Sequence, residues 1–131
     1  MRALLGALLC CSVLLPLLGC DPPKIKEFDG PTVPKFVGKV LHEGKPVKFS
    51  DDEIVNVMLP FQKTGRLWTI PVESDGSFNI TWMPIGKYTA ILERRDKADR
   101  KKQSKYTITD DFRIEDGKTE YTFELGPNWK Q

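Results

Sequence analysis

Apolar and polar side chains alternate along most of the chain between Phe36 and Gly126. Alternation with a period of two residues is typical of strands that bury one of their faces. The pattern gives about seven inward-facing sets: 36, 38 and 40; 55, 57 and 59; 68, 70 and 72; 78, 80 and 82; 88, 90 and 92; 106, 108, 112 and 114; and 121, 123 and 125. No stretch of residues 20–131 sustains the 3.6-residue period of a helix, so we expect an all-β domain.

Turn sequences separate these stretches at 43–46, 74–77, 83–86 and 116–117. The pair Asp-Gly stands in two of them, at 75–76 and 116–117, and is a strong signal for a hairpin. We therefore expect hairpins at both places. About seven short strands, with turns every 8–12 residues, are typical of a β-sandwich whose two sheets pack face to face.

Two segments resemble the carboxypeptidase-regulatory-like domains. They read VGKV at 37–40 with GKPV at 44–47, and DGSFNI at 75–80 with MPIGKYT at 83–89. The resemblance implies a single antiparallel, Greek-key, transthyretin-like sandwich over 36–126. It also implies a non-catalytic function, because members of this family are accessory, adhesive or ligand-binding modules. A fold alone assigns no function, so the site has to be argued from its own residues.

The N-terminus has the features of a secretory signal peptide. A single charge, Arg2, precedes an apolar run over 3–18, which is shorter than the roughly 20 residues that span a bilayer. The sequence LLGC at 17–20 resembles a bacterial lipobox, which implies cleavage after Gly19 and diacylation of Cys20. The alternative is an ordinary signal peptide with a cysteine nearby.

These features divide the chain into four parts: a lipoprotein signal peptide over 1–19, a lipid anchor and Pro-rich tether over 20–35, the sandwich over 36–126, and a tail over 127–131. Cleavage would remove Cys10 and Cys11, so the mature chain would keep Cys20 alone and could form no internal disulfide. The prolines of 20–35 favour extended backbone and hence a spacer. In the alternative, Phe28 packs on the domain and shortens the reach of the spacer.

Composition narrows the chemistry. Twenty basic and 18 acidic residues give a formal charge of +2, which provides no general case for nucleic-acid binding. The one histidine, His42, stands beside Glu43, and any Ser-His or Cys-His catalysis would depend on it. The acidic runs at 51–53 and 110–111 lack the spacing of a calcium loop. We therefore expect no enzyme, metal or cofactor, and an active site around His42 is the alternative.

The most unusual local feature is the basic run RRDKADRKKQSK at 94–105, which we interpret as a long hairpin loop with a local charge of +5. Its cations are candidates for contact with anionic lipid, an anionic envelope polymer or an envelope protein. The alternative is a solvated loop, and the run has no aromatic residue for stacking on nucleic acid. The seven cations are Arg94, Arg95, Lys97, Arg100, Lys101, Lys102 and Lys105.

The tryptophans bear on ligand binding. Trp68 and Trp82 fall in inward-facing sets and are expected in the core, whereas Trp129 lies outside the strand pattern and is a candidate ligand platform. The sequence thus predicts a lipid-anchored protein of the cell envelope, facing the periplasm or exterior, that acts as a non-catalytic binding or structural module. The alternative is a small-ligand or carbohydrate binder that uses exposed aromatic side chains. Pairing of a partner with an open strand edge is a further mode of interaction.

Overall fold

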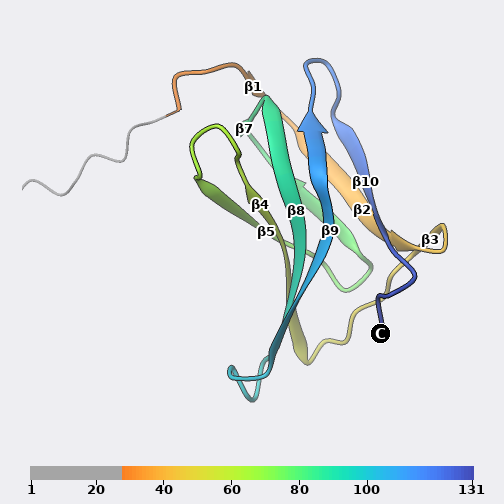
Figure 1. The fold of residues 1–131 in the computed structure, drawn as a ribbon. Coiled ribbons are helices and arrows are strands. Elements are labelled where there is room, and N and C mark those ends of the chain that lie inside the picture. Colours follow the sequence, from red (N-terminus) through yellow and green to blue (C-terminus); the bar gives the residue numbers. More distant parts are fainter. Residues whose placement is uncertain (1–27) are drawn as a thin grey trace, which may run out of the picture.

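The computed structural model describes residues 28–131, so the expected signal peptide and Cys20 lie outside the described residues. All regular secondary structure within 28–131 is β-strand, which confirms the all-β class (Figure 1). The strands are β1 (Thr32–Val33), β2 (Phe36–His42), β3 (Lys45–Pro46), β4 (Glu53–Pro60), β5 (Leu67–Pro71), β6 (Ser77–Ile80), β7 (Met83–Pro84), β8 (Gly86–Asp96), β9 (Gln103–Ile114) and β10 (Glu120–Leu125).

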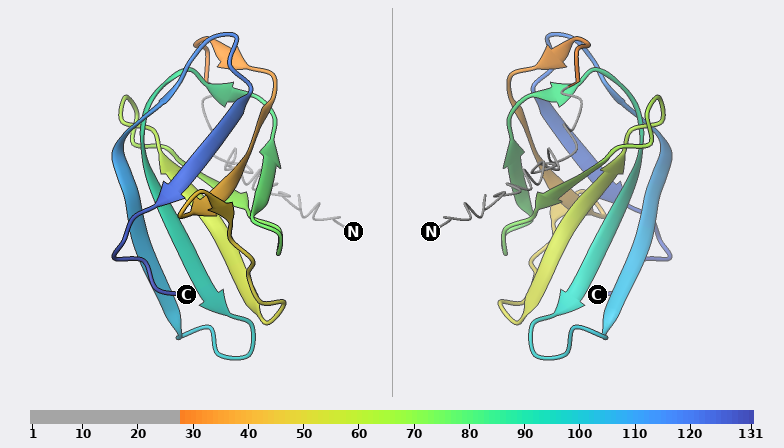
Figure 2. Two further views of the ribbon diagram at one scale, coloured as in Figure 1. Left: turned by 90° about the vertical axis from the view of Figure 1, so that its right-hand side faces the viewer. Right: turned by 90° about the vertical axis from the view of Figure 1, so that its left-hand side faces the viewer.

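Two four-stranded sheets face each other, an arrangement consistent with a β-sandwich (Figure 2). One sheet has the order β5-β4-β8-β9. In the other, β2 is central and pairs with β10, β3 and β6, while the short pair β1-β7 closes one end. Aromatic rings join the two layers: Phe112 of β9 lies 4.8 Å from Phe123 of β10 and 6.1 Å from Phe36 of β2, between ring centroids.

The two expected hairpins have different outcomes. At 74–77 the chain does reverse in a short hairpin, because Val72 forms an antiparallel bridge with Phe78 and the Glu73 amide donates to the Ser77 carbonyl oxygen at 2.8 Å. Beyond this bridge β5 and β6 belong to different sheets, and the turn at 116–117 joins β9 to β10, which also belong to different sheets. An Asp-Gly turn supplies the positive φ for a sharp reversal, and that reversal serves a crossing between layers as well as a hairpin. At Gly76, φ is 84° and an added Cβ would lie 2.6 Å from the carbonyl oxygen of Val47, so glycine is required there.

One strand pair is parallel, so the prediction of a wholly antiparallel sandwich is wrong. Strand β10 runs alongside β2 in the same direction, with Tyr121 opposite Gly38 and Phe123 opposite Val40. The other strand pairs within 28–131 are antiparallel. Parallel strands need a long crossover between them, and here the rest of the domain forms that connection.

The expected tether contributes to the fold from Phe28 onward. The Phe28 ring meets Phe61 edge-on at 5.6 Å, and β1 pairs with β7. Val33 is buried, and the amide of Ile85 donates to the carbonyl of Pro31 at 2.9 Å. The sandwich therefore includes residues 28–35, and Phe28 adopts the packed arrangement that shortens the spacer.

Most inward-facing sets are buried as expected, but Trp82 is not. Strand β6 ends at Ile80, Trp82 has a φ of 60°, and 66% of its surface is exposed. The prediction that Trp82 belongs to the core is therefore wrong, because the positive φ breaks the alternation at the end of the strand. Trp68 is half-buried and packs edge-on against Phe61 at 6.2 Å and Tyr88 at 6.3 Å.

Tyr88 places a polar group in the centre of the core. Its side chain is fully buried, and its hydroxyl donates to the carbonyl oxygen of Pro84 at 2.7 Å. Burial raises the pKa of the Tyr88 phenol well above its ordinary value of about 10. The hydroxyl thus stays protonated in the folded chain and holds β7 against the start of β8.

We expect Tyr88→Phe to lower the free energy of unfolding by about 1–2 kcal/mol at neutral pH, because the buried Pro84 carbonyl would lose its donor. A phenol whose pKa is higher in the folded than in the unfolded state stabilises the fold below the unfolded pKa, and this contribution is lost as pH rises. The parent chain should therefore lose stability above about pH 10 more steeply than the variant. Urea denaturation at several pH values measures both effects, and equal stability of the two proteins at pH 7 would contradict the hydrogen bond.

Candidate functional site

The sandwich has two different ends (Figure 1). At one end, which we call the β1 end, residues 28–34 and the β1-β7 pair lie beside the starts of β2 and β10 and the end of β4. The opposite end carries the turn 97–102 between β8 and β9, which we call the tip. The polypeptide thus enters the described domain at one end and presents its basic turn at the other.

The basic run is mostly strand, so the interpretation of 94–105 as one long loop is wrong. Strand β8 continues to Asp96 and β9 begins at Gln103, with Arg94 opposite Ser104 and Arg95 opposite Gln103. The polar side chains remain in strand because the other strands of the sheet supply partners for them. Only the six residues of the tip form the turn.

Four of the seven cations are held by the domain itself. The Nη2 atom of Arg94 lies 2.5 Å from Glu53 Oε1, and Arg95 Nε lies 3.0 Å from Glu93 Oε1. Lys105 Nζ lies 3.9 Å from Glu93 Oε2, and Lys97 Nζ donates to the carbonyl oxygen of Asp51. Since Glu93 is almost fully buried, its cations offset the cost of removing a carboxylate from water. The structure therefore gives these four cations intramolecular contacts.

The tip is an ordered turn. Asp96 Oδ1 accepts hydrogen bonds from the amides of Ala98 at 2.7 Å and Asp99 at 3.0 Å, and Asp99 Oδ1 accepts from the amide of Lys101 at 3.1 Å. The bonds from Asp99 and Ala98 lower the pKa of Asp96, so its carboxylate stays charged and keeps the turn closed. The two acidic side chains face the backbone of the turn. Three exposed side chains, Arg100, Lys101 and Lys102, form the tip cations.

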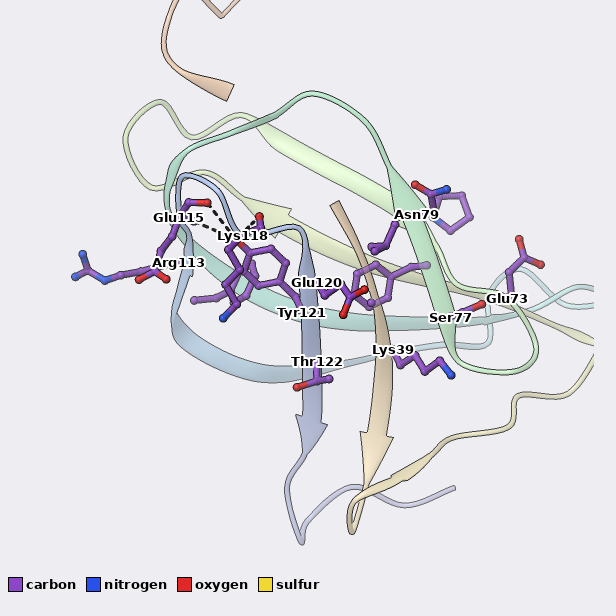
Figure 3. A pocket seen from close by; sticks show the side chains of 15 residues that line it. Lys39, Glu73, Ser77, Asn79, Arg113, Glu115, Lys118, Glu120, Tyr121 and Thr122 are labelled. Atoms are coloured by element: carbon purple, nitrogen blue, oxygen red, sulfur yellow. Dashed lines mark hydrogen bonds between the residues drawn. The ribbon is translucent and has the colours of Figure 1, made fainter. Parts of the chain in front are cut away.

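A second candidate surface is a groove of about 1050 Å³ that crosses β10, β2 and β6 (Figure 3). Charges of both signs surround it: Lys39, Arg113, Lys118, Glu73, Glu115 and Glu120. Uncharged polar side chains, including Asn79 and Thr122, lie between them. A surface of this kind offers many hydrogen-bond donors and acceptors to a polar ligand.

Tyr121 fixes one rim of the groove. Its hydroxyl accepts a hydrogen bond from the Glu115 amide at 3.0 Å and donates to the carbonyl oxygen of Lys118 at 3.3 Å (Figure 3). The Lys118 Nζ atom lies 4.8 Å from the centroid of the same ring. Burial raises the pKa of the Tyr121 phenol, which keeps the hydroxyl able to donate. The turn that borders the groove is thereby tied to β10.

Trp129 offers no exposed ligand platform. Only 7% of its surface is exposed, and its ring packs between His42, 5.1 Å away, and the guanidinium of Arg94, 5.8 Å away. The tail is also fastened by Gln131 Nε2, which donates to the Lys48 carbonyl at 3.1 Å. This correction has a simple cause: the tail is irregular, so strand alternation says nothing about its burial. The same contact makes His42 a packing partner of Trp129.

The remaining sequence predictions concern the anchor and metals. Cys20 lies outside the described residues, so its acylation stays a prediction. Within residues 28–131, no helix is long and apolar enough to cross a membrane. In that same part of the chain, His, Cys, Asp and Glu side chains form no group of three or more that could ligate a metal ion.

The comparisons with known proteins give no match. No family model fits the chain, and no curated protein and no solved structure is significantly similar to it. The resemblance to carboxypeptidase-regulatory-like domains therefore depends on the segments 37–47 and 75–89 themselves.

Proposed function

We propose that this chain is an exported lipoprotein, anchored in a membrane through an acylated Cys20, whose sandwich is a non-catalytic interaction module for a protein of the cell envelope. The apolar N-terminus and the LLGC sequence at 17–20 support the anchor. The two facing sheets and the segments 37–47 and 75–89 support the finer assignment to a transthyretin-like, carboxypeptidase-regulatory-like domain.

The observation that carries the proposal is the separation of the tip from the β1 end (Figure 1). Strand β9 has 12 residues, which at about 3.3 Å each extend about 40 Å. Charges on lipid headgroups are screened over about 8–10 Å at physiological salt. When the β1 end faces the membrane, the tip cations therefore lie beyond the reach of the headgroup charge and point toward other components of the envelope.

The small number of tip cations without a partner in the described domain favours a protein, rather than a polyanion, as the binding partner. Binding to a polyanion gains strength with each phosphate or carboxylate that a cation neutralises, and four of the seven cations already contact partners within the domain. A small, ordered group of three cations matches an acidic patch on a protein surface. An anionic polymer is the other outcome that the following experiment distinguishes.

Neutralising the tip should weaken capture of this partner. We expect the variant Arg100→Gln/Lys101→Gln/Lys102→Gln to recover about tenfold less of a specific protein from detergent-solubilised envelope, since each exposed charge pair contributes about 0.5 kcal/mol. The full-length lipoprotein serves as bait at moderate salt, and bound proteins are quantified by mass spectrometry.

A matched control removes three exposed cations elsewhere, in the variant Lys35→Gln/Lys48→Gln/Lys63→Gln, and should retain the partner. Recovery that survives loss of the tip cations but not of the control cations would reject the tip as the binding surface. Recovery of polymer alone, lost with the tip charges, would replace the protein partner by an anionic polymer.

The groove favours one second candidate function, the binding of a small ligand or carbohydrate. Its volume of about 1050 Å³ is at the upper end of the range for ligand sites. The rings of Phe78 and Tyr121 that line it are buried, so recognition would depend on polar groups such as Lys39 and Thr122. Amide NMR shifts confined to β2 and β10 during titration with a panel of sugars would favour this function, and Lys39→Ala should then weaken binding.

A further inference from the structure

Trp82 has an unusual combination of exposure and backbone conformation. It is the most exposed of the large apolar side chains in the described chain, with 66% of its surface accessible against 46% for Leu67 and 41% for Ile54. Its φ of 60° lies in the left-handed region, which bulky residues rarely adopt. Conformational strain of this kind persists where the surrounding structure enforces it, often at functional positions.

The strained backbone turns the indole outward. Residues 78 and 80 face the core in β6, and a regular continuation of the strand would bring residue 82 to the same face. The positive φ at Trp82 ends this alternation, so the ring reaches solvent instead of the core. The chain therefore gives up the favourable burial of a large aromatic side chain, and an external partner would recover it.

The position of Trp82 identifies that partner. Its amide donates to the carbonyl oxygen of Pro34 at 3.4 Å, and the next two residues form β7, which pairs with β1. The indole is thus carried by the segment that holds the chain entering the domain. Cys20 precedes Phe28 by eight residues, which span at most about 29 Å when fully extended. A lipid anchor at Cys20 keeps this end of the sandwich near the bilayer.

On the basis of the proposed function, we infer that the Trp82 side chain inserts into the interface between headgroups and acyl chains of the membrane that holds Cys20. The indole combines an apolar body with an N–H donor, and tryptophan is enriched at this depth of membrane proteins for that reason. Trp82 and the lipid then form two points of attachment. Together they set the orientation in which the β1 end faces the bilayer and the tip faces away from it.

Chemical coupling tests this contact without relying on acylation by the cell. In the mature chain, residues 20–131, Cys20 is the single cysteine and can be coupled to a maleimide lipid in vesicles of phosphatidylcholine and phosphatidylglycerol. Residues 28–131 contain the whole core described above. Because Trp129 is buried and Trp68 half-buried, quenching of fluorescence by acrylamide reports mainly on Trp82.

We expect coupling to lower the acrylamide quenching constant severalfold, to shift the emission to shorter wavelength, and to make the fluorescence sensitive to lipids with brominated acyl chains. The variant Trp82→Gly should lose all three changes. The variant Ile54→Thr, which alters another exposed apolar residue, should keep them. Glycine accepts the positive φ, so Trp82→Gly should unfold at no lower temperature than the parent, which excludes unfolding as the cause.

Unchanged quenching after coupling, or no effect of brominated lipids, would overturn the inference. Shielding that appears without vesicles and grows with protein concentration would also overturn it, in favour of contact between two copies of the chain. Failure of the proposed function has a separate signature, which is the absence of acyl label on Cys20 in cells. In that case a coupled protein that still inserts Trp82 would preserve the membrane-binding surface and reject the natural anchor.

Discussion

The variant Cys20→Ala, exported behind an ordinary cleavable signal peptide in place of residues 1–19, is expected to lose all incorporation of an alkyne-labelled palmitate and to move from the membrane fraction to the soluble fraction. Two or three acyl chains hold a protein on a bilayer firmly, whereas a single apolar side chain such as that of Trp82 contributes only weak, reversible binding. Click labelling of whole cells, followed by fractionation and immunoblotting, measures both effects. The expected loss of membrane association is nearly complete, which makes this the largest effect of any change considered.

Two neighbouring cysteines provide the control for this experiment. Cys10 and Cys11 lie in the same N-terminal segment and would be removed with the signal peptide. The double variant Cys10→Ala/Cys11→Ala should therefore keep both the label and the membrane association of the parent. Label that persists in Cys20→Ala would reject acylation at this position and with it the lipoprotein proposal.

The variant Gly38→Ala is expected to lower the free energy of unfolding by about 3 kcal/mol, the upper part of the usual range for overpacking. A Cβ at this position would lie 2.0 Å from the carbonyl oxygen of Tyr121 and 2.6 Å from the ring of Phe78. The carbonyl belongs to the backbone of β10, so relief of the clash requires β10 to move away from β2. Thermal and urea unfolding should show a decrease in Tm of roughly 10–20 °C for a domain of this size.

Gly44→Ala is the matched comparison. Gly44 has a φ of 75°, but no atom lies within 4 Å of the place where its Cβ would be. This substitution therefore carries the conformational cost alone, about 1 kcal/mol. If Gly38→Ala is no more destabilising than Gly44→Ala, the close parallel pairing of β10 with β2 is incorrect.

The alternation of apolar and polar residues was sufficient to predict the all-β fold class and most of the strands. It was not sufficient to predict how the strands connect. Alternation located β4, β8 and β10 because each buries one face against the other sheet. The same Asp-Gly sequence serves a hairpin or a crossing between sheets, and the choice depends on contacts with residues far along the chain. For that reason neither the crossing at 74–77 nor the parallel pair β2-β10 could be predicted from the sequence.

The candidate site shows the same limit. The sequence singled out the basic run, but the pairing of Arg94 with Glu53, 41 residues earlier, follows from the sheet and reduces the free cations to the tip. The predicted exposures of two tryptophans are wrong for a related reason: Trp82, expected in the core, is exposed, and Trp129, a candidate ligand platform, is buried. Alternation assigns a residue to a face only while the strand continues, and it gave no information at the end of β6 or in the tail.

The parallel pairing of β10 with β2 also has a consequence for biosynthesis. Gly38 and Tyr121 meet across about 80 residues of sequence, so the sheet around β2 stays incomplete until the last strand is available. A topology dominated by such distant contacts folds slowly. A chain that crosses a membrane from its N-terminus would thus remain unfolded until residues 120–125 emerge on the far side. If the chain is exported as proposed, this delay would keep it unfolded while it passes through the membrane, and truncation within β10 would leave the sheet around β2 incomplete.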